Sequence, residues 1–235
     1  TTRDALDTPF KLEGEPCLLV DTAGIRRKAR INDRVERFSV SHSLRSVDRG
    51  DVIIHILDGV EGVTDQDAQI LSYAWQRGKA MLLTVNKWDL VSKTGADVES
   101  YREDVYHQLS FLDFVPVTFI SASRGYGVRK MLETAGAVLR AYGKKVSTSA
   151  MNQALQQIVR AHAAPLAQGK PVKFYYGTQT GTRPPTFTLF VNTPQAVAES
   201  YRRYLIHQLR EHLALQYTPV RLVLRARREE PRRKR

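Results

Sequence analysis

Short apolar runs alternate with longer amphipathic stretches through the first 145 residues of the chain. Runs of Val, Ile and Leu bounded by polar residues predict strands, and apolar residues that recur every three or four positions predict helices. We therefore expect strands at 16–21, 51–58, 79–87 and 115–121, preceded by an edge strand at 8–14, and helices at 35–47, 65–77, 98–111 and 127–142. This alternation is typical of a parallel α/β sheet, and apolar residues on both faces of the strands predict helices on each side.

A different pattern follows the basic, small-residue stretch 143-GKKVSTS-149. Helix, strand, strand, helix and strand are expected in turn, at 150–163, 171–180, 185–192, 195–213 and 219–227. This order predicts a small α+β domain. We therefore divide the chain into a first domain at 1–145, a second at 146–227 and a basic tail at 228–235.

Charge separates the same two parts. Residues 1–145 carry 21 basic and 20 acidic side chains, whereas residues 146–235 carry 15 basic and 4 acidic, a net charge of +11. A nearly neutral domain joined to a strongly basic one predicts a polyanionic partner, although a basic solubilising surface has the same composition. The candidate surface contains six arginines, Arg202, Arg203, Arg210, Arg221, Arg225 and Arg227. The aromatic residues of 174-FYY-176 are expected to be mostly core, with stacking on bases as the alternative.

The remaining composition excludes several classes of protein. One cysteine, Cys17, leaves no internal disulfide framework and no cysteine cluster for zinc, which fits a reducing compartment. The longest apolar runs, such as 52-VIIHIL-57, are too short to span a bilayer. We therefore expect a cytoplasmic protein without a membrane partner. Within the first domain, we expect His55 to be a hydrogen-bonded core residue and Trp75 to be buried.

The first candidate motif, 21-DTAG-24, lies at the end of a predicted strand. Ligands of parallel α/β folds bind beyond the carboxyl ends of strands. There, Asp21 can hold a hydrated Mg²⁺, and the backbone N–H of Gly24 can approach a terminal phosphate. Upstream, 1-TTRD-4 offers a threonine hydroxyl that can bind Mg²⁺ while that phosphate is present, so the segment can act as a switch.

The second candidate motif, 86-NKWD-89, ends another predicted strand and supplies base specificity. Asp89 can accept hydrogen bonds from both N1–H and the 2-amino group of guanine, a pair of donors that adenine lacks. Asn86 can reach N7, and the aliphatic part of Lys87 can lie over the ring. An isolated motif of this kind can also be a turn in which the aspartate caps a helix.

The third candidate motif, 121-SAS-123, follows the last predicted strand of the first domain. Ser121 and Ala122 lie at the strand end, where the backbone N–H of Ala122 can donate to O6 of guanine and disfavour the 6-amino group of adenine. Three motifs in this order, each after an apolar strand, are unlikely to arise by chance. Together they predict a guanine-nucleotide site.

These motifs resemble those of the Era-related GTPases, and the C-terminal module narrows the resemblance to the double-Era family called EngA or Der. The stretches that carry it are 84-TVNKWDLV-91, 172-VKFYYGTQT-180, 184-PPTFTLFVN-192 and 219-PVRLVLRAR-227. The resemblance implies a P-loop-NTPase-type parallel sheet followed by a KH-like domain. It implies GTP or GDP with Mg²⁺ as ligands and K⁺ as a candidate accelerator. By the same resemblance Thr2 and Asp21 bind Mg²⁺, Asp21 in its second shell, and Gly24 senses the γ-phosphate.

The resemblance also implies partners: the large ribosomal subunit or its RNA, and an upstream GTPase domain of the same chain.

Two departures from the family pattern qualify the resemblance. The sequence contains no G-x-x-x-x-G-K-[ST] motif, so we expect the natural protein to be longer and the present sheet to lack its first strand and P-loop. We expect this chain alone to bind GTP poorly. The second domain contains no G-x-x-G loop between helices, which disfavours the usual RNA groove of KH domains.

Two rival interpretations remain. The leading one is a GTP-hydrolysing switch whose basic module engages the assembling ribosome. Ile25 follows Gly24 where Ras-like enzymes have a water-positioning glutamine, so slow intrinsic turnover is expected and no catalytic residue is assigned. The alternatives are an RNA-binding or ribosome-binding module on a GTPase fold that does not hydrolyse, and another Era-like GTPase.

Overall fold

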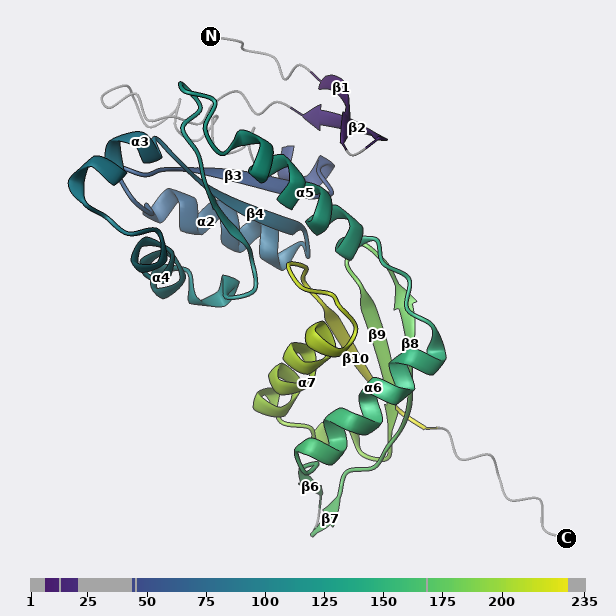
Figure 1. Cartoon of the computed structure of the whole chain (residues 1–235). Helices are drawn as coiled ribbons and strands as arrows, with labels where there is room; N and C mark the ends of the chain where they lie inside the picture. Colours follow the sequence, from purple (N-terminus) through teal and green to yellow (C-terminus); the bar gives the residue numbers. More distant parts are fainter. Residues whose placement is uncertain (1–6, 13, 21–43, 45, 168, 228–235) are drawn as a thin grey trace, which may run out of the picture. The chain divides into compact units, whose positions relative to one another are not determined.

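A computed structural model describes residues 7–12, 14–20, 44, 46–167 and 169–227 (Figure 1). The chain divides into two compact units, Thr1–Arg140 and Ala141–Arg235. Most of the helix predicted at 35–47 lies outside the described residues. Within the described part of the chain, no helix is both long and apolar enough to cross a membrane.

The first unit contains a hairpin and a parallel sheet. Strands β1 (Asp7–Leu12) and β2 (Glu15–Val20) pair in antiparallel orientation. The parallel sheet has the order β3-β4-β5, with β3 at Val52–Asp58, β4 at Ala80–Asn86 and β5 at Val117–Phe119. The helices are α2 (Asp65–Gln76), α3 (Trp88–Val91), α4 (Val98–Gln108) and α5 (Val128–Tyr142), with short 3-10 turns η1 (Ser92–Thr94) and η2 (Ser110–Leu112). The predicted alternation of strands and helices is confirmed.

Strand β4 forms the centre of this sheet. Its residues from Ala80 to Val85 are all buried, with α2 on one face and α5 on the other (Figure 1). The prediction that every strand is covered on both faces is wrong for β2 and β3, because Leu18, Leu19 and Ile56 are exposed. Among the described residues, the hairpin β1-β2 pairs with no other strand, and a two-stranded ribbon cannot cover both of its own faces.

Helix α2 begins with the predicted cap. The hydroxyl of Thr64 accepts from the N–H of Asp67, and the Asp67 carboxylate accepts from the N–H of Thr64, which forms a capping box. The Asp67 carboxylate also contacts Nε2 of His55 at 2.8 Å, so the prediction of a hydrogen-bonded histidine is confirmed. The prediction for Trp75 is wrong. Its side chain is 44% exposed, because α2 buries a narrow stripe formed by Ile70, Leu71 and Ala74.

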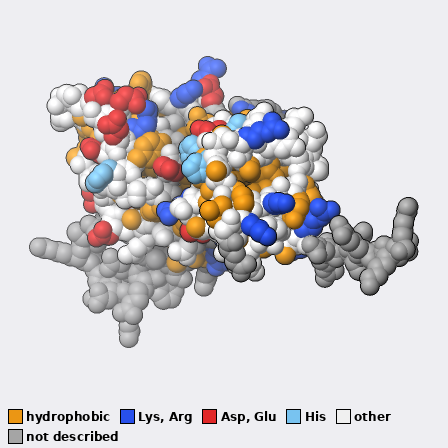
Figure 2. All heavy atoms as spheres, turned by 90° about the horizontal axis from the view of Figure 1, so that it is seen from below, with side chains coloured by type: hydrophobic (Ala, Val, Ile, Leu, Met, Phe, Trp, Pro, Cys, Tyr) orange, Lys and Arg blue, Asp and Glu red, His pale blue; other side chains and the backbone are white. Residues whose placement is uncertain are grey.

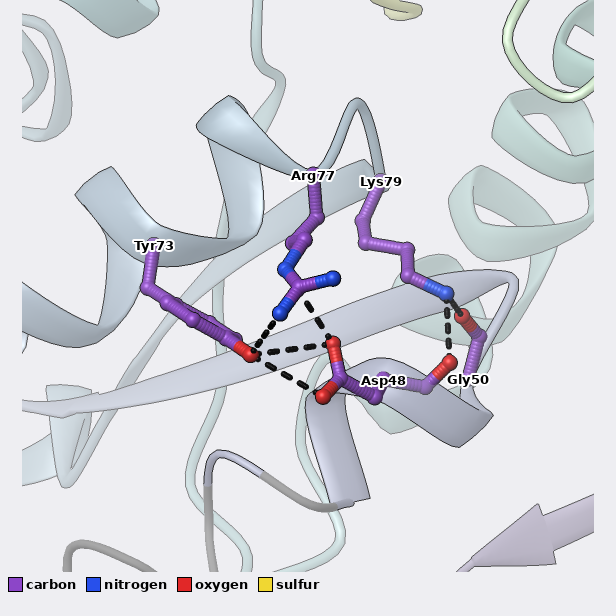
Figure 3. Close-up of polar contacts among 5 residues, drawn as sticks. All are labelled: Asp48, Gly50, Tyr73, Arg77 and Lys79. Carbon is purple, nitrogen blue, oxygen red and sulfur yellow. Dashed lines mark hydrogen bonds and ion pairs between the residues drawn. The ribbon is translucent and has the colours of Figure 1, made fainter.

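A polar network ties the C-terminal half of α2 to the segment that precedes β3 (Figure 3). The hydroxyl of Tyr73 donates to the carboxylate of Asp48 at 2.9 Å and accepts from Nη2 of Arg77 at 2.9 Å. The ammonium group of Lys79 donates to the carbonyl oxygens of Asp48 and Gly50 at 2.7 and 2.8 Å. The network lies at the N-terminal end of the strands, opposite the predicted nucleotide site.

The second unit has the predicted order of helix, two strands, helix and strand. These elements are α6 (Thr148–Ala161), β8 (Phe174–Gly181), β9 (Thr186–Val191), α7 (Glu199–His212) and β10 (Arg221–Ala226), with a small pair β6 (Leu166–Ala167) and β7 (Lys170–Pro171) and a 3-10 turn η3 (Pro194–Ala196). The sheet has the order β10-β9-β8, with β8 antiparallel and β10 parallel to β9. The α/β plus α+β fold class is confirmed.

Helices α6 and α7 cover one face of this sheet (Figure 1). Phe187 and Leu189 of β9 pack with Met151 of α6 and Leu205 of α7 in one buried cluster. Gly177 of β8 allows the close approach of α6, because a Cβ there would lie 3.0 Å from Cε of Met151 on that helix.

Strand β8 lies at the edge of the sheet, and α6 reaches its outer side through one side chain. The amide of Asn152 accepts from the N–H of Gly177 at 2.8 Å and donates to the Gly177 carbonyl at 3.0 Å. A side chain therefore satisfies the two backbone groups that a further strand would otherwise pair with.

Candidate functional site

The predicted binding residues lie where the three parallel strands of the first unit end. Asn86, the last residue of β4, pairs with Asp58, the last residue of β3. The N–H of Ile120, just after β5, donates to the carbonyl of Val85 at 2.8 Å, and the N–H of Trp88 donates back to the Ile120 carbonyl at 3.0 Å. Two motifs far apart in the sequence are therefore held side by side by backbone hydrogen bonds.

Asn86 and Ala122 contact each other directly. The N–H of Ala122, which we expected to reach O6 of a guanine, donates to Oδ1 of Asn86 at 3.0 Å. A backbone N–H requires an acceptor, so this bond directs the carbonyl end of the Asn86 amide toward Ala122. The Nδ2 end is then the one available to an acceptor on a bound base.

Lys87 has a left-handed backbone conformation, with φ of 61°, and begins α3. Its Nζ atom lies 2.6 Å from Oδ2 of Asp58. The next side chain, Trp88, is buried and contacts the rings of Tyr101 and Phe119 edge-on, at centroid distances of 5.4 and 4.6 Å. The packing of Trp88 and the ion pair between Lys87 and Asp58 thus hold the left-handed backbone at Lys87 in place.

Asp89 lies between two groups that stabilise its charge. The side chain of Ser121 hydrogen-bonds to it, and the guanidinium of Arg124 lies 3.3 Å from its Oδ2 atom. The hydrogen bond from Ser121 has the largest effect and lowers the pKa of Asp89; desolvation opposes it, and the charge of Arg124 adds a smaller lowering, so the net shift is downward. The carboxylate is therefore ionised at neutral pH, as a double acceptor must be.

Two glycines shape the backbone around these side chains. A Cβ on Gly59, directly after β3, would lie 2.7 Å from the carbonyl oxygen of Asn86, which accepts a hydrogen bond from the Gly59 N–H at 2.9 Å. Gly127 closes the turn after Ser121 with φ of 73°, and a Cβ there would lie 2.3 Å from the carbonyl oxygen of Phe119. Neither position accepts a larger residue without movement of a strand end.

Sequence reasoning missed Asp58, Gly59 and Arg124 as members of this site. The register of β3 against β4 would have placed Asp58 beside the 86-NKWD-89 motif, and the turn after 121-SAS-123 would have returned Arg124 toward it. The other predicted residues, Thr2, Asp21 and Gly24, lie outside the described residues.

The six candidate arginines of the second unit fall into two groups. Arg202, Arg203 and Arg210 lie on α7, where Arg202 donates to the Leu222 carbonyl at 3.5 Å and Arg210 to the Thr218 carbonyl at 3.2 Å. Three others follow one another on and after β10: Arg221, Arg225 and Arg227. In Figure 2, basic side chains are scattered over the visible face rather than gathered in one patch.

Comparisons with known proteins match the two parts of the chain separately. A family model described as "KH-domain-like of EngA bacterial GTPase enzymes, C-terminal" matches residues 145–225. A second, described as "50S ribosome-binding GTPase", matches residues 1–87. The two models thus match a GTPase domain in the first part of the chain and a KH-like domain in the second.

Relatives identify the particular family. The chain is 46% identical over 229 residues to GTPase Der of Moorella thermoacetica, covering 97% of this chain and 52% of that protein. It is 45% identical over 222 residues to GTPase Der of Syntrophotalea carbinolica, covering 94% of this chain and 51% of that protein. The chain belongs to the EngA/Der family, and it spans about half the length of these relatives.

Two solved structures of Era were among those found in the comparison. A variant of Era from Aquifex aeolicus bound to GDP.AlF4- has a TM-score of 0.48 and 15% identity, with 97% of this chain and 83% of that chain covered. Era in complex with MgGDPNP and a segment of 16S ribosomal RNA also has a TM-score of 0.48, with 17% identity and the same coverage.

Proposed function

We propose that this chain is the guanine-nucleotide-binding and KH-like part of a GTPase that acts in assembly of the large ribosomal subunit. The observation that carries the nucleotide part is the meeting of Asn86, Asp89 and Ala122 at one edge of the parallel sheet. The names of the relatives and the description "50S ribosome-binding GTPase" support the hydrolytic and ribosomal parts.

Guanine recognition follows from the geometry of these side chains. The ionised Asp89 accepts from N1–H and the 2-amino group, while Nδ2 of Asn86 donates toward N7 and O6. Ser121 and Arg124 orient the carboxylate, and Asp58 fixes Lys87 so that its aliphatic part can cover the base. Adenine would leave the Asp89 carboxylate without its two donors, which strongly disfavours adenine nucleotides.

The γ-phosphate side of the proposal rests on residues outside the described ones. When bound, Mg²⁺ would stabilise the charge on the transferred phosphoryl group. Thr2 and Asp21 are proposed to hold it, with Gly24 as the γ-phosphate sensor, and K⁺ is proposed as an accelerator of hydrolysis. Because Ile25 replaces the water-positioning glutamine of Ras-like enzymes, intrinsic turnover is expected to be slow.

The basic second unit is the proposed contact with ribosomal RNA or with a neighbouring GTPase domain of the same protein. The net charge of +11 over residues 146–235 supports a polyanionic partner. A cytoplasmic location and the absence of a membrane partner are proposed with it. We propose residue 145 as the end of the nucleotide-binding part, five residues after the boundary between the two units of the structure.

Substitution of Asp89 tests the nucleotide assignment. In Asp89→Asn, the amide can donate to the 2-oxo group of xanthine but cannot accept from two guanine donors at once. Fluorescent GDP and XDP titrations should show a preference for GDP in the wild-type chain and a reversed preference in the variant. Glu103→Gln, which removes an exposed carboxylate from α4, is the matched control and should keep the GDP preference.

The rival function is an RNA-binding module that does not hydrolyse GTP, and the net charge of +11 over residues 146–235 fits it as well. The same titrations separate the two. Equal binding of GDP and ADP contradicts the guanine site and leaves the rival, whereas weak binding that still prefers GDP supports the site.

A further inference from the structure

The sheet of the second unit has a second face, opposite the one covered by α6 and α7. Because side chains alternate along a strand, the burial of Phe187, Leu189 and Val191 against the helices places Thr188 and Phe190 on the opposite face. The register pairs Phe190 with Arg225 of β10 and with Tyr176 of β8, so these three side chains form one row across that face.

Aromatic rings dominate this row. The rings of Tyr176 and Phe190 are stacked, with centroids 4.4 Å apart and planes inclined by 18°. Tyr176 nevertheless remains 42% exposed. Beside it, a register shift between Phe174 and Tyr176 gives Tyr175 an irregular position, and that ring is also 42% exposed. The stacked pair therefore presents an open aromatic surface on this side of the sheet.

Positive charge accompanies the rings. The guanidinium carbon of Arg227 lies 4.9 Å from the ring centroid of Tyr175, and Arg225 is exposed beside Phe190. The strands β8, β9 and β10 contain no acidic residue. Within these three strands, the face therefore combines π surfaces with cations and carries no acidic side chain.

We infer that this face, formed by Tyr175, Tyr176, Phe190, Arg225 and Arg227, binds single-stranded RNA. Bases stack on exposed aromatic side chains whatever their sequence, and arginines beside the rings neutralise the phosphates that link them. A duplex hides its base faces, so the rings favour an unpaired strand. This inference deepens the RNA contact of the proposed function and rests on it. It places that contact on the sheet rather than in a groove beside a G-x-x-G loop, a motif that residues 146–235 do not contain.

The test measures fluorescence anisotropy of a labelled ten-nucleotide RNA, single-stranded and as a duplex, with the whole chain. Tyr176→Val keeps a strand-forming residue but removes the ring, and it should weaken binding of the single strand roughly 5- to 100-fold. Arg225→Gln should weaken it and lower the slope of log Kd against log salt by about 0.7. Tyr176→Val should leave that slope unchanged.

Arg160→Gln is the matched control, because Arg160 is exposed on α6, which packs against the other face of the sheet. It should bind RNA like the wild type. All variants keep the basic tail, and thermal unfolding confirms that they fold. If Tyr176→Val and Arg225→Gln bind single strands as the wild type does, the RNA contact lies elsewhere and the inference is wrong while the proposed function stands. If the wild-type chain binds no RNA at low salt, the inference and the RNA contact of the proposed function are both wrong. The nucleotide titrations remain an independent test of the first unit.

Discussion

The Nζ atom of Lys87 lies 2.6 Å from Oδ2 of Asp58, which joins the 86-NKWD-89 motif to the end of the neighbouring strand. The pair is partly shielded, since the Asp58 side chain is 16% exposed and that of Lys87 is 38% exposed. The lysine of the motif is thus held by a carboxylate that lies outside the motif in the sequence.

Asp58→Asn should weaken GDP binding by about fivefold, because the loss of a charge-assisted contact of about 1 kcal/mol leaves Lys87 less well positioned over the base. The ratio of GDP to ADP affinity should not change, since Asp58 does not face the base edge in the proposed arrangement. Titration with both nucleotides measures the two quantities. A changed ratio with unchanged GDP affinity would contradict this role.

Gly59→Ala should destabilise the first unit by roughly 1–3 kcal/mol. The added Cβ would lie 2.7 Å from the carbonyl oxygen of Asn86 and 3.0 Å from Cγ2 of Val91, so the ends of β3 and β4 must separate. Urea unfolding measures the change. Gly181→Ala is the control, because its Cβ would meet only Thr186 at ordinary contact distance, 3.4 Å. Equal stability of the two variants would show that the strand ends are not closely packed.

Asp67→Asn should cost about 1 kcal/mol, because it weakens the capping box with Thr64 and removes a charged partner of His55. Burial raises the pKa of Asp67, but the hydrogen bonds of His55 and Thr64 outweigh it, and the net shift is downward. A lowered native pKa gives stability that is present above the unfolded-state pKa of about 4 and is lost as the pH falls through the native pKa.

Below about pH 4, the wild-type chain should therefore lose the stability that the ionised Asp67 contributes. The variant Asp67→Asn lacks this contribution at every pH, so its stability should not fall for this reason. Thermal unfolding at a series of pH values measures the difference between the two proteins. Asp65→Asn, in the same first turn but exposed, controls for the charge at the helix N-terminus. A gap between wild type and Asp67→Asn that stays constant from pH 7 to pH 2 would contradict the assignment.

Tyr73→Phe should destabilise the first unit by about 1 kcal/mol, because the phenol is the hydroxyl that joins Asp48 to Arg77 (Figure 3). Tyr126→Phe, at an exposed position, is the control and should leave the unfolding midpoint unchanged. Guanidinium titration of both variants is sufficient. A loss as large for Tyr126→Phe would mean that the hydroxyl of Tyr73 contributes nothing specific.

Much of this fold could be predicted from the sequence, because its signals are local. The apolar run of β4, the cap at Thr64 and the change of pattern after residue 143 each depend on neighbouring residues only. The burial of Trp75 was predicted wrongly for the same reason, since a helical stripe does not show how wide a face its neighbours cover.

The candidate site was predictable only in part. The motif residues Asn86, Asp89 and Ala122 are expected at strand ends, and a parallel sheet brings such ends together. Their partners Asp58 and Arg124 depend on register and on the course of a turn, which residue types alone do not determine. The bond from the Ala122 N–H to Asn86 does not follow from residue types either, because each of these groups is equally suited to a base.

The side-chain amide of Asn152 occupies the outer N–H and C=O of Gly177. Exposed strand borders of this kind invite pairing between molecules, which leads to aggregation and domain swapping. By filling the hydrogen-bonding positions in the middle of β8, this asparagine gives the second unit a built-in protection against self-association that leaves the aromatic surface of the same sheet accessible.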